Sequence, residues 1–310
     1  MRWLSDDKLN YLRAVVSNPD FSSTKYTFVK ELGRGGMGVV YLAEDRELDR
    51  LVAIKVLNTP EVTEELRGRM VREAQIIARL EHPGIVPVHD AGTLSDGRIF
   101  YAMKFVRGNR LDEYVAAGAS LRDRLRKFQA VCDAVAFAHA HGVIHRDLKP
   151  QNIMIGSFGE VLVLDWGVAK IRNDPRQSAA YDTSPGTVIG TQTYMSPEQA
   201  RGDINQLDER ADVYSLGAVL HFLLMDQPKV SKPAHAIRFK AMAQAPENRY
   251  STASELSDDI GRLLDAEPVS AYRENAVEKV SRWVSKNRFL VLLVLAYLLM
   301  RIFFIFTARS

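Results

Sequence analysis

The feature that most constrains the fold is a polar loop of fixed spacing between two short apolar runs. The runs occupy 143–144 and 153–155, and the loop between them carries Asp147, Lys149 and Asn152. A carboxylate can accept a proton from a hydroxyl group, a cation can neutralise charge on a phosphoryl group, and an amide oxygen can bind Mg²⁺. The pattern therefore predicts two strands joined by a loop that suits phosphoryl transfer. An ordinary loop between two strands is the alternative.

The composition is that of a globular chain. Of 310 residues, 46% are hydrophobic and 25% are charged, which is typical of folded domains, and the length allows one large or two ordinary domains. The formal net charge of +3 argues against a dedicated nucleic-acid binder. Cys132 is the single cysteine, so the chain forms no intrachain disulfide, which fits a reducing compartment. We expect Cys132 to be a core residue.

A glycine-rich turn lies near the start of the chain. Residues 1–24 predict a short amphipathic helix and a linker, and strands are predicted at 26–32, 38–44 and 51–57. Between the first two strands, Gly33, Gly35 and Gly38 form the pattern G-x-G-x-x-G. Glycine lets backbone N–H groups approach phosphates. Because a strand rather than a helix follows, a hairpin covering a nucleotide fits better than a dinucleotide site. A plain glycine hairpin is the alternative.

One lysine and one glutamate lie on elements that are otherwise apolar. Lys55 belongs to the strand Val-Ala-Ile-Lys-Val at 52–56, and Glu73 lies on the apolar stripe of a helix predicted at 63–80. A carboxylate on an apolar face needs a partner. We expect Glu73 to pair with Lys55, the alternative being a solvated glutamate at the edge of the stripe.

A second acidic motif follows the loop. A strand predicted at 160–164 ends in Asp165-Trp166-Gly167, and residues 170–197 then show no periodicity and are rich in serine and threonine. This stretch closes with Gly-Thr-Gln-Thr-Tyr-Met-Ser-Pro-Glu at 190–198.

Together these motifs resemble those of protein kinases. The loop His-Arg-Asp-Leu-Lys-Pro-Gln-Asn is similar to the catalytic loop H-R-D-L-K-P-x-N, and Val-Ala-Ile-Lys is similar to the V-A-I-K strand. Asp-Trp-Gly stands where the family usually has D-F-G, and Ser-Pro-Glu stands for A-P-E. The resemblance covers about 25–266. Because the loop contains a lysine, as serine/threonine kinases do, the chain resembles bacterial, eukaryotic-like (Hanks-type) serine/threonine kinases.

The resemblance implies an α+β, bilobal protein-kinase fold. A small antiparallel sheet with one helix, αC, would occupy 25–106, and a larger helical lobe would occupy 107–266. Helices are predicted at 121–141, 212–224 and 251–264. Asp212 would brace the catalytic loop, and Glu198 would pair with Arg249. Residues 213–248 are fewer than the family normally places before that arginine, so we expect a shortened αG region, which puts substrate docking in doubt.

The resemblance also implies the chemistry of the site. Asp147 would orient the acceptor hydroxyl and accept its proton, and Lys149 would stabilise charge. The catalytic residues would be Asp147, Lys149, Lys55 and Glu73, and the ligands of Mg²⁺ or Mn²⁺ would be Asn152 and Asp165. ATP would be bound by Leu32, Gly33, Gly35, Gly36, Gly38, Val40, Ala53, Lys55, Met103, Lys104, Val106 and Met154.

Regulation by phosphorylation is a further implication. Arg146 precedes the catalytic aspartate, and kinases with this arginine are commonly switched by a phosphate that pairs with it. Thr183, Ser184 and Thr187 are the candidate sites, and Thr191 would bridge the catalytic aspartate and lysine. A solvated Ser/Thr-rich loop is the alternative.

The C-terminal stretch predicts a membrane segment. Residues 267–288 are polar with a basic end, and 289–306 are apolar at 17 of 18 positions, the exception being Arg301. This length suffices for one transmembrane helix. Lys286 and Arg288 before it would place the kinase on the cytoplasmic side. A monotopic anchor or a buried helix are the alternatives.

The expected function is that of a serine/threonine protein kinase. It would transfer the γ-phosphoryl group of ATP to protein hydroxyls, autophosphorylate within a homodimer, and signal from the cytoplasmic face of the cell inner membrane as a single-pass protein. A membrane-tethered pseudokinase that binds ATP and scaffolds partners is the alternative. Trp166 and the shortened αG region favour that alternative, whereas the intact catalytic residues oppose it. A small-molecule kinase is a second alternative, but it would lack the Gly-Thr-Gln-Thr-Tyr-Met-Ser-Pro-Glu motif that is present at 190–198.

Overall fold

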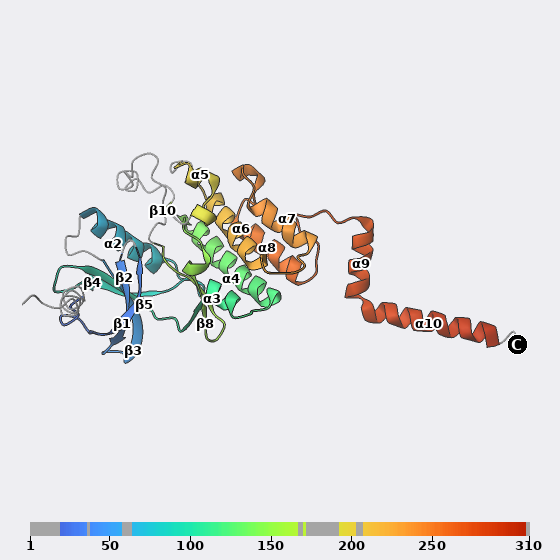
Figure 1. The fold of residues 1–310 in the computed structure, drawn as a ribbon, viewed down its shortest axis with the longest axis horizontal. Helices are drawn as coiled ribbons and strands as arrows, with labels where there is room; N and C mark the ends of the chain where they lie inside the picture. Colours follow the sequence, from blue (N-terminus) through green and yellow to red (C-terminus); the bar gives the residue numbers. More distant parts are fainter. Residues whose placement is uncertain are drawn as a thin grey trace, which may run out of the picture.

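The computed structural model describes residues 19–35, 38–57, 64–166, 170–171, 192–202 and 207–307. Within them the chain forms two lobes followed by a helical arm (Figure 1). The helix predicted in 1–24 falls almost wholly outside the described residues, as does Gly36.

The smaller lobe is built on a five-stranded antiparallel sheet. Its spatial order is β1-β2-β3-β5-β4. The strands are β1 Tyr26–Gly35, β2 Gly38–Asp45, β3 Arg50–Val56, β4 Val88–Thr93 and β5 Ile99–Lys104. β3 pairs with β5 so that Lys55 lies opposite Tyr101. One helix, α2 Glu64–Arg79, packs beside β4 and β5. The strands predicted at 26–32, 38–44 and 51–57 and the helix predicted at 63–80 are therefore confirmed.

The larger lobe is helical and is organised around two long helices. These are α4 Leu121–Ala140 and α6 Arg210–Leu224, which pack against each other. The remaining helices are α3 Leu111–Ala116, α5 Pro197–Ala200, α7 Lys232–Ala241 and α8 Ala253–Leu264. α4 begins at the N-cap Ser120, whose hydroxyl accepts from the Asp123 N–H. It is followed by Gly142 at φ +74°, a backbone conformation that favours glycine.

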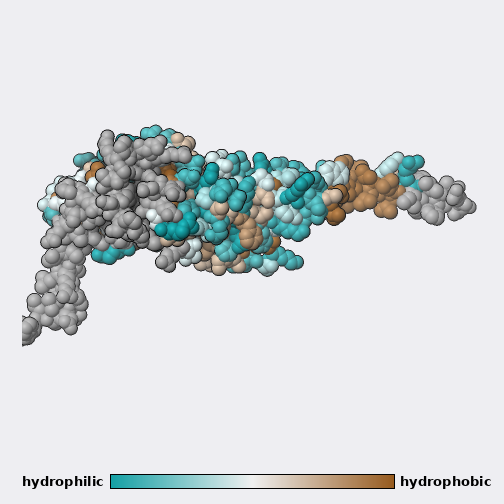
Figure 2. Space-filling view, turned by 90° about the horizontal axis from the view of Figure 1, so that it is seen from above, coloured by the Kyte–Doolittle hydropathy of each residue, from teal (hydrophilic) through white to brown (hydrophobic). Residues whose placement is uncertain are grey.

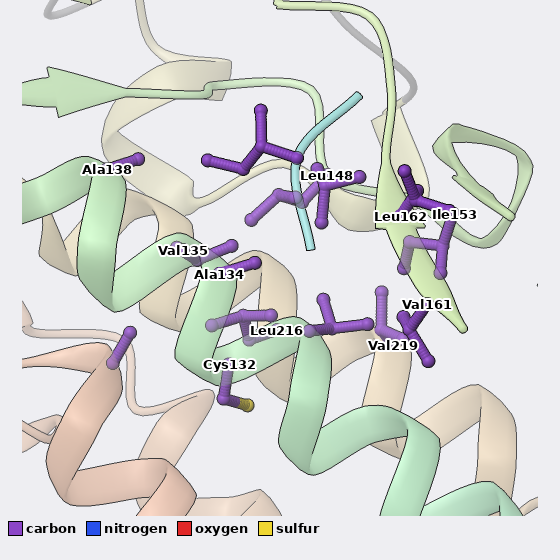
Figure 3. Packing of buried hydrophobic residues seen from close by; sticks show 14 of the residues in the cluster. Cys132, Ala134, Val135, Ala138, Leu148, Ile153, Val161, Leu162, Leu216 and Val219 are labelled. Carbon is purple, nitrogen blue, oxygen red and sulfur yellow. The ribbon is translucent and has the colours of Figure 1, made fainter. Parts of the chain in front are cut away.

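The core of this lobe reaches directly under the catalytic loop. Cys132, Val135 and Ala138 of α4 lie near Leu216 of α6 and near Leu148 of the loop (Figure 3). All five side chains are fully buried. Burial raises the pKa of the Cys132 thiol well above its ordinary value, so the prediction that it is a core residue is confirmed. The polar loop is thus packed, through Leu148, on the buried apolar core of the helical lobe.

Short strands border the loop on both sides. They are β6 Gly108–Arg110, β7 Val143–Ile144, β8 Ile153–Gly156, β9 Val161–Val163 and β10 Lys170–Ile171. β7 pairs with β10, whereas β8 lies between β6 and β9. Both apolar runs that bracket the loop are therefore strands, as predicted. They belong to different sheets, so the loop joins two sheets instead of closing a hairpin.

The region before Arg249 contains one α-helix. Over 207–307, which is fully described, α7 and the short 3-10 helix Pro246–Asn248 lie between α6 and α8, and residues 225–231 connect α6 to α7. This agrees with the shortened region expected from the sequence.

The arm consists of α9 Ala276–Lys286 and α10 Arg288–Thr307. α10 coincides with the predicted transmembrane segment. Within the described part of the chain, no single helix meets the length and hydropathy criteria for crossing a membrane. Ala276–Val284 and Arg288–Arg301 meet them together across a bend of 85°. The transmembrane helix thus stays a prediction.

Candidate active site

The catalytic loop brings its three predicted side chains together. The Nζ atom of Lys149 donates to Oδ2 of Asp147 at 2.7 Å. The amide nitrogen of Asn152 donates to the backbone oxygen of Asp147 at 2.8 Å and to its Oδ2 at 3.1 Å. The carboxylate is therefore fixed by two neighbours of the same loop.

A buried aspartate from α6 fixes the backbone of this loop. Asp212 is fully buried and accepts hydrogen bonds from the N–H groups of His145 at 2.7 Å and of Arg146 at 2.8 Å. Arg146 has φ +69°, a strained conformation for a non-glycine residue that surrounding structure must maintain. His139 of α4 lies 2.8 Å from the same carboxylate. The sequence predicted the bracing by Asp212 but not the contribution of His139.

The charge on Asp212 is stabilised despite its burial. Burial alone opposes ionisation, but the hydrogen bond and the charge of His139 outweigh it, and the pKa of Asp212 is lowered from its ordinary value. The aspartate therefore stays an acceptor for the loop N–H groups at neutral pH.

The predicted pair of Lys55 and Glu73 is formed, and a second carboxylate joins it. Lys55 Nζ lies 2.8 Å from Glu73 Oε1 and 2.9 Å from Asp165 Oδ1. Burial would lower the pKa of Lys55, but the charge of Glu73 outweighs it, so this pKa is raised well above its ordinary value. Lys55 thus remains a cation. Through its contacts with Glu73 and Asp165, Lys55 connects α2, the helix that corresponds to αC, with the segment just after β9.

A tyrosine that the sequence reasoning missed completes this pair. The hydroxyl of Tyr101 donates to Oε1 of Glu73 at 2.7 Å, and Tyr101 is almost fully buried. In the β3–β5 register it stands directly opposite Lys55. The interstrand register that aligns them was not readable from the sequence.

The Asp-Trp-Gly segment is held in an unusual backbone conformation. Asp165 has φ +60°. The pKa of its carboxyl is lowered, because the charge of Lys55 outweighs the effect of burial. Trp166 is buried against His145, with ring centroids 4.6 Å apart, and belongs to the same core cluster as Ile77. The rings of Trp166 and of His145 in the catalytic loop therefore pack on each other.

The tryptophan at this position carries a cost. Its indole N–H is buried and finds no hydrogen-bond partner among the described residues. An unpaired buried donor costs about 1–3 kcal/mol. The ring nevertheless packs on His145, so this contact does not require phenylalanine at position 166.

The oxygen atoms available here fit Mg²⁺. Because the amide nitrogen of Asn152 donates to Asp147, its oxygen is the atom left to act as a ligand. Asp165 is ionised, since its pKa is lowered, and its side chain is half exposed. Mg²⁺ prefers such oxygen ligands and typically uses one or two carboxylates together with substrate phosphates. Among the described residues no group of three or more His, Cys, Asp or Glu side chains could hold a metal alone.

The glycines of the β1–β2 hairpin have different roles. A Cβ atom on Gly38 would lie 2.4 Å from the backbone oxygen of Val56, so glycine is required there for packing against β3. A Cβ on Gly33 or Gly35 would meet nothing closer than 3.9 Å. The argument that glycine admits phosphates therefore suits Gly33 and Gly35, whereas Gly38 has a structural role.

The other predicted nucleotide-site residues lie on strands of both lobes or beside them. Ala53 is opposite Met103 in the β3–β5 register, and Met103 and Met154 are partly buried against the main core. The N–H of Lys104 donates to the carbonyl of Pro87 at 3.1 Å. The backbone group that Lys104 can offer an adenine is accordingly its carbonyl. The rest are Leu32 on β1, Val40 on β2 and Val106 just after β5.

The predicted ion pair of Glu198 and Arg249 is formed and is buried in the helical lobe. Arg249 donates to both carboxylate oxygens of Glu198, at 2.6 and 2.8 Å. It also donates to the backbone oxygens of Ala243, Arg210 and Gln244. This arginine joins α5 to the start of α6 and the turn before α8.

The regulatory predictions are only partly open to inspection. Thr183, Ser184, Thr187 and Thr191 lie outside the described residues. Arg146 is buried, and its carbonyl accepts from the amide of Gln199 at 2.8 Å. Arg146 is therefore hydrogen-bonded to α5, which begins at the end of the serine- and threonine-rich stretch 170–197.

Known proteins are similar to this chain in sequence and in fold. Residues 26–273 match the protein kinase domain family. The chain is 36% identical over 289 residues to the serine/threonine-protein kinase PknB of Mycobacterium tuberculosis, covering 83% of this chain and 45% of that protein. It is 35% identical over 282 residues to PrkC of Bacillus subtilis, covering 81% and 42%. The chain thus spans less than half the length of these relatives.

A solved structure agrees with this relationship. The crystal structure of the Mycobacterium tuberculosis PknI kinase domain superposes with a TM-score of 0.59 and 28% sequence identity, covering 77% of this chain and 96% of that one. The chain therefore belongs to the protein kinase family, among relatives that are bacterial serine/threonine-protein kinases.

Proposed function

We propose that this protein is an active serine/threonine protein kinase that transfers the γ-phosphoryl group of ATP to protein hydroxyls. One observation carries the proposal: the two halves of a phosphoryl-transfer site are assembled together. Lys55 contacts Glu73 and Asp165, while Asp147 is held by Lys149 and Asn152 of the catalytic loop. A scaffold that only binds partners has no need of both arrangements.

The residues divide the reaction between them. The serine or threonine oxygen forms a bond to the γ-phosphorus, and the bond to the oxygen bridging the β- and γ-phosphorus breaks, releasing ADP. Asp147 orients the hydroxyl and receives its proton, and Lys149, 2.7 Å away, neutralises developing charge. Lys55, kept cationic by Glu73, holds the phosphates. When bound through Asn152 and Asp165, Mg²⁺ would supply charge neutralisation between the phosphates.

We propose further that the kinase is attached to the cell inner membrane, with its catalytic lobes on the cytoplasmic side, and that it signals from there. α10 supports this because its side chains from Phe289 to Met300 are almost all apolar and exposed. Lys286 precedes α10 and Arg288 is its first residue, and basic residues favour the cytoplasmic side. We also propose autophosphorylation between two copies, on the serines and threonines of residues 172–191.

Phosphotransfer from radiolabelled Mg-ATP tests the catalytic proposal. The full chain should label itself and a generic protein acceptor, whereas Asp147→Asn should not. Asp258→Asn makes the same chemical change at an exposed position of α8 and should label like wild type. If wild type labels no more than Asp147→Asn, the protein is a pseudokinase and the proposal fails. Mass spectrometry of the labelled protein then identifies the modified residues.

A further inference from the structure

The arm contains a helix whose hydrophobic face points away from the protein. Val277, Val280, Trp283 and Val284 of α9 recur at helical spacing and so share one face. Their exposed fractions range from 39% to 77%. A surface helix of a soluble domain normally turns such a face toward the core. This face instead has no partner within the described part of the chain.

The polar face of α9 holds the helix to the kinase lobe. Glu278 accepts a hydrogen bond from Nζ of Lys232, at the start of α7, at 2.7 Å. Arg282 pairs with Glu274, on the connection that leads into α9, at 2.9 Å. Glu278 and Arg282 therefore face the protein, while the valines and the tryptophan face outward. That is the reverse of a helix packed on a core.

The angle between α9 and the next helix, α10, suggests what the exposed hydrophobic face of α9 contacts. α10 follows after Asn287 at an angle of 85° to α9. Its 20 residues extend about 30 Å, which matches the hydrocarbon thickness of a bilayer. Figure 2 shows a continuous hydrophobic patch over α10. If α10 enters a bilayer along its normal, an 85° bend places α9 almost parallel to the membrane surface.

We propose that α9 is an interfacial helix that lies on a bilayer containing anionic lipids, with its valine and tryptophan face at the level of the headgroups. This inference rests on the proposed membrane attachment through α10. Tryptophan is enriched at that depth. Lys279 and Arg288 are exposed beside the face, where they would meet anionic headgroups. The ion pair of Glu278 with Lys232 then holds the helical lobe against the membrane.

A second copy of the chain is the competing occupant of this face. In a two-fold symmetric contact the same patch meets itself, so the exposed charges of Lys279 and Arg288 would be brought toward identical charges. An anionic lipid surface removes this repulsion. It is also continuous with the apolar surface of α10, so the bilayer is the better partner for the face.

The fluorescence of Trp283 tests the proposal in the full chain. The chain has three tryptophans, Trp3, Trp166 and Trp283. Trp3→Phe removes one, and Trp166 is buried in the kinase core. The protein is reconstituted into vesicles of phosphatidylcholine and phosphatidylglycerol, with bromine placed either high or low on the acyl chains. We expect stronger quenching by the shallow bromines than by the deep ones, together with protection from aqueous acrylamide.

Two variants make the test specific. Val277→Ser with Val280→Ser and Val284→Ser should still float with the vesicles through α10 but lose the shallow quenching. Val29→Ser with Leu48→Ser removes exposed apolar side chains from the small lobe and should leave the quenching unchanged.

Each result bears on a different claim. If wild type does not float, the membrane attachment itself fails. If it floats but Trp283 stays open to acrylamide, α9 is not interfacial and the inference fails. If protection disappears when the protein is diluted with empty lipid, a second copy covers the face, and the inference is again wrong. Quenching that persists on dilution and disappears only in the serine variant supports it.

Discussion

Removing Arg249 should destabilise the helical lobe more than any other single loss of charge outside the cleft. Its side chain is fully buried and donates to both oxygens of Glu198 and to three backbone carbonyls. Arg249→Ala leaves a mostly buried carboxylate without its cation. Breaking a buried ion pair in this way costs about 3–5 kcal/mol, a large part of the stability of an ordinary domain.

Urea unfolding of the full chain in a non-ionic detergent measures this loss. The fluorescence of the buried Trp166 reports the transition, and the midpoint and slope give the free energy of unfolding. Arg262→Ala is the matched control. Arg262 also makes an ion pair with an aspartate, at 3.0 Å, but its side chain is 45% exposed, so we expect a loss of at most about 1 kcal/mol. A loss that small for Arg249→Ala would refute the reasoning.

The pH dependence gives a second, independent check. Burial raises the pKa of Glu198, but the hydrogen bonds from Arg249 outweigh it, so this pKa is below its ordinary value. A carboxyl with a lowered pKa stabilises the folded state above its unfolded-state pKa of about 4.3, and the contribution disappears as the pH falls through the folded-state value. Without the arginine, burial alone acts, and protonation of Glu198 relieves the penalty. The difference between wild type and Arg249→Ala should therefore narrow as the pH falls toward 4, and a constant difference would contradict this account.

Three further changes probe the cleft. Tyr101→Phe removes one hydrogen bond to the charged Glu73, so kcat/KM for ATP should fall about tenfold in initial-rate measurements, and the free energy of unfolding should fall by about 1–3 kcal/mol; an unchanged kcat/KM would show that the hydroxyl does not position the glutamate. Asp212→Asn puts an amide group where an acceptor of three hydrogen bonds stood, so it should lower both phosphotransfer and the free energy of unfolding, the latter by about 1–3 kcal/mol; normal activity would refute the bracing role. Gly38→Ala should destabilise the small lobe by about 1–3 kcal/mol because its Cβ would meet a β3 carbonyl, while Gly35→Ala should not; equal unfolding midpoints for the two variants would contradict this difference.

The sequence could predict which side chains of the catalytic loop lie together because phosphoryl transfer requires particular side chains at short, fixed spacings. Asp147, Lys149 and Asn152 lie within one loop, so local chain geometry alone brings them together. The pair of Glu198 and Arg249 was also predicted, although only from the resemblance, since no local pattern joins two residues so far apart.

Contacts that depend on register or on helix packing were not predictable. Tyr101 reaches Glu73 because β3 and β5 align it with Lys55, and a shift of the register by one residue would turn it to the other face. His139 reaches Asp212 because α4 packs on α6. The requirement for glycine at position 38 depends on how closely β3 approaches.

By itself the sequence determined the kind of chemistry, the two lobes and an apolar C-terminal helix, because composition, periodicity and motif spacing are properties of the chain. Only the tertiary structure decided which way each face points. The hydrophobic pattern of α9 is equally compatible with packing on the lobe. The outward direction of its valines follows from the ion pairs of Glu278 and Arg282 with residues that precede the helix. The pair of Lys232 and Glu278 joins charges that are 46 residues apart, and a linear pattern carries no information about which distant charges meet.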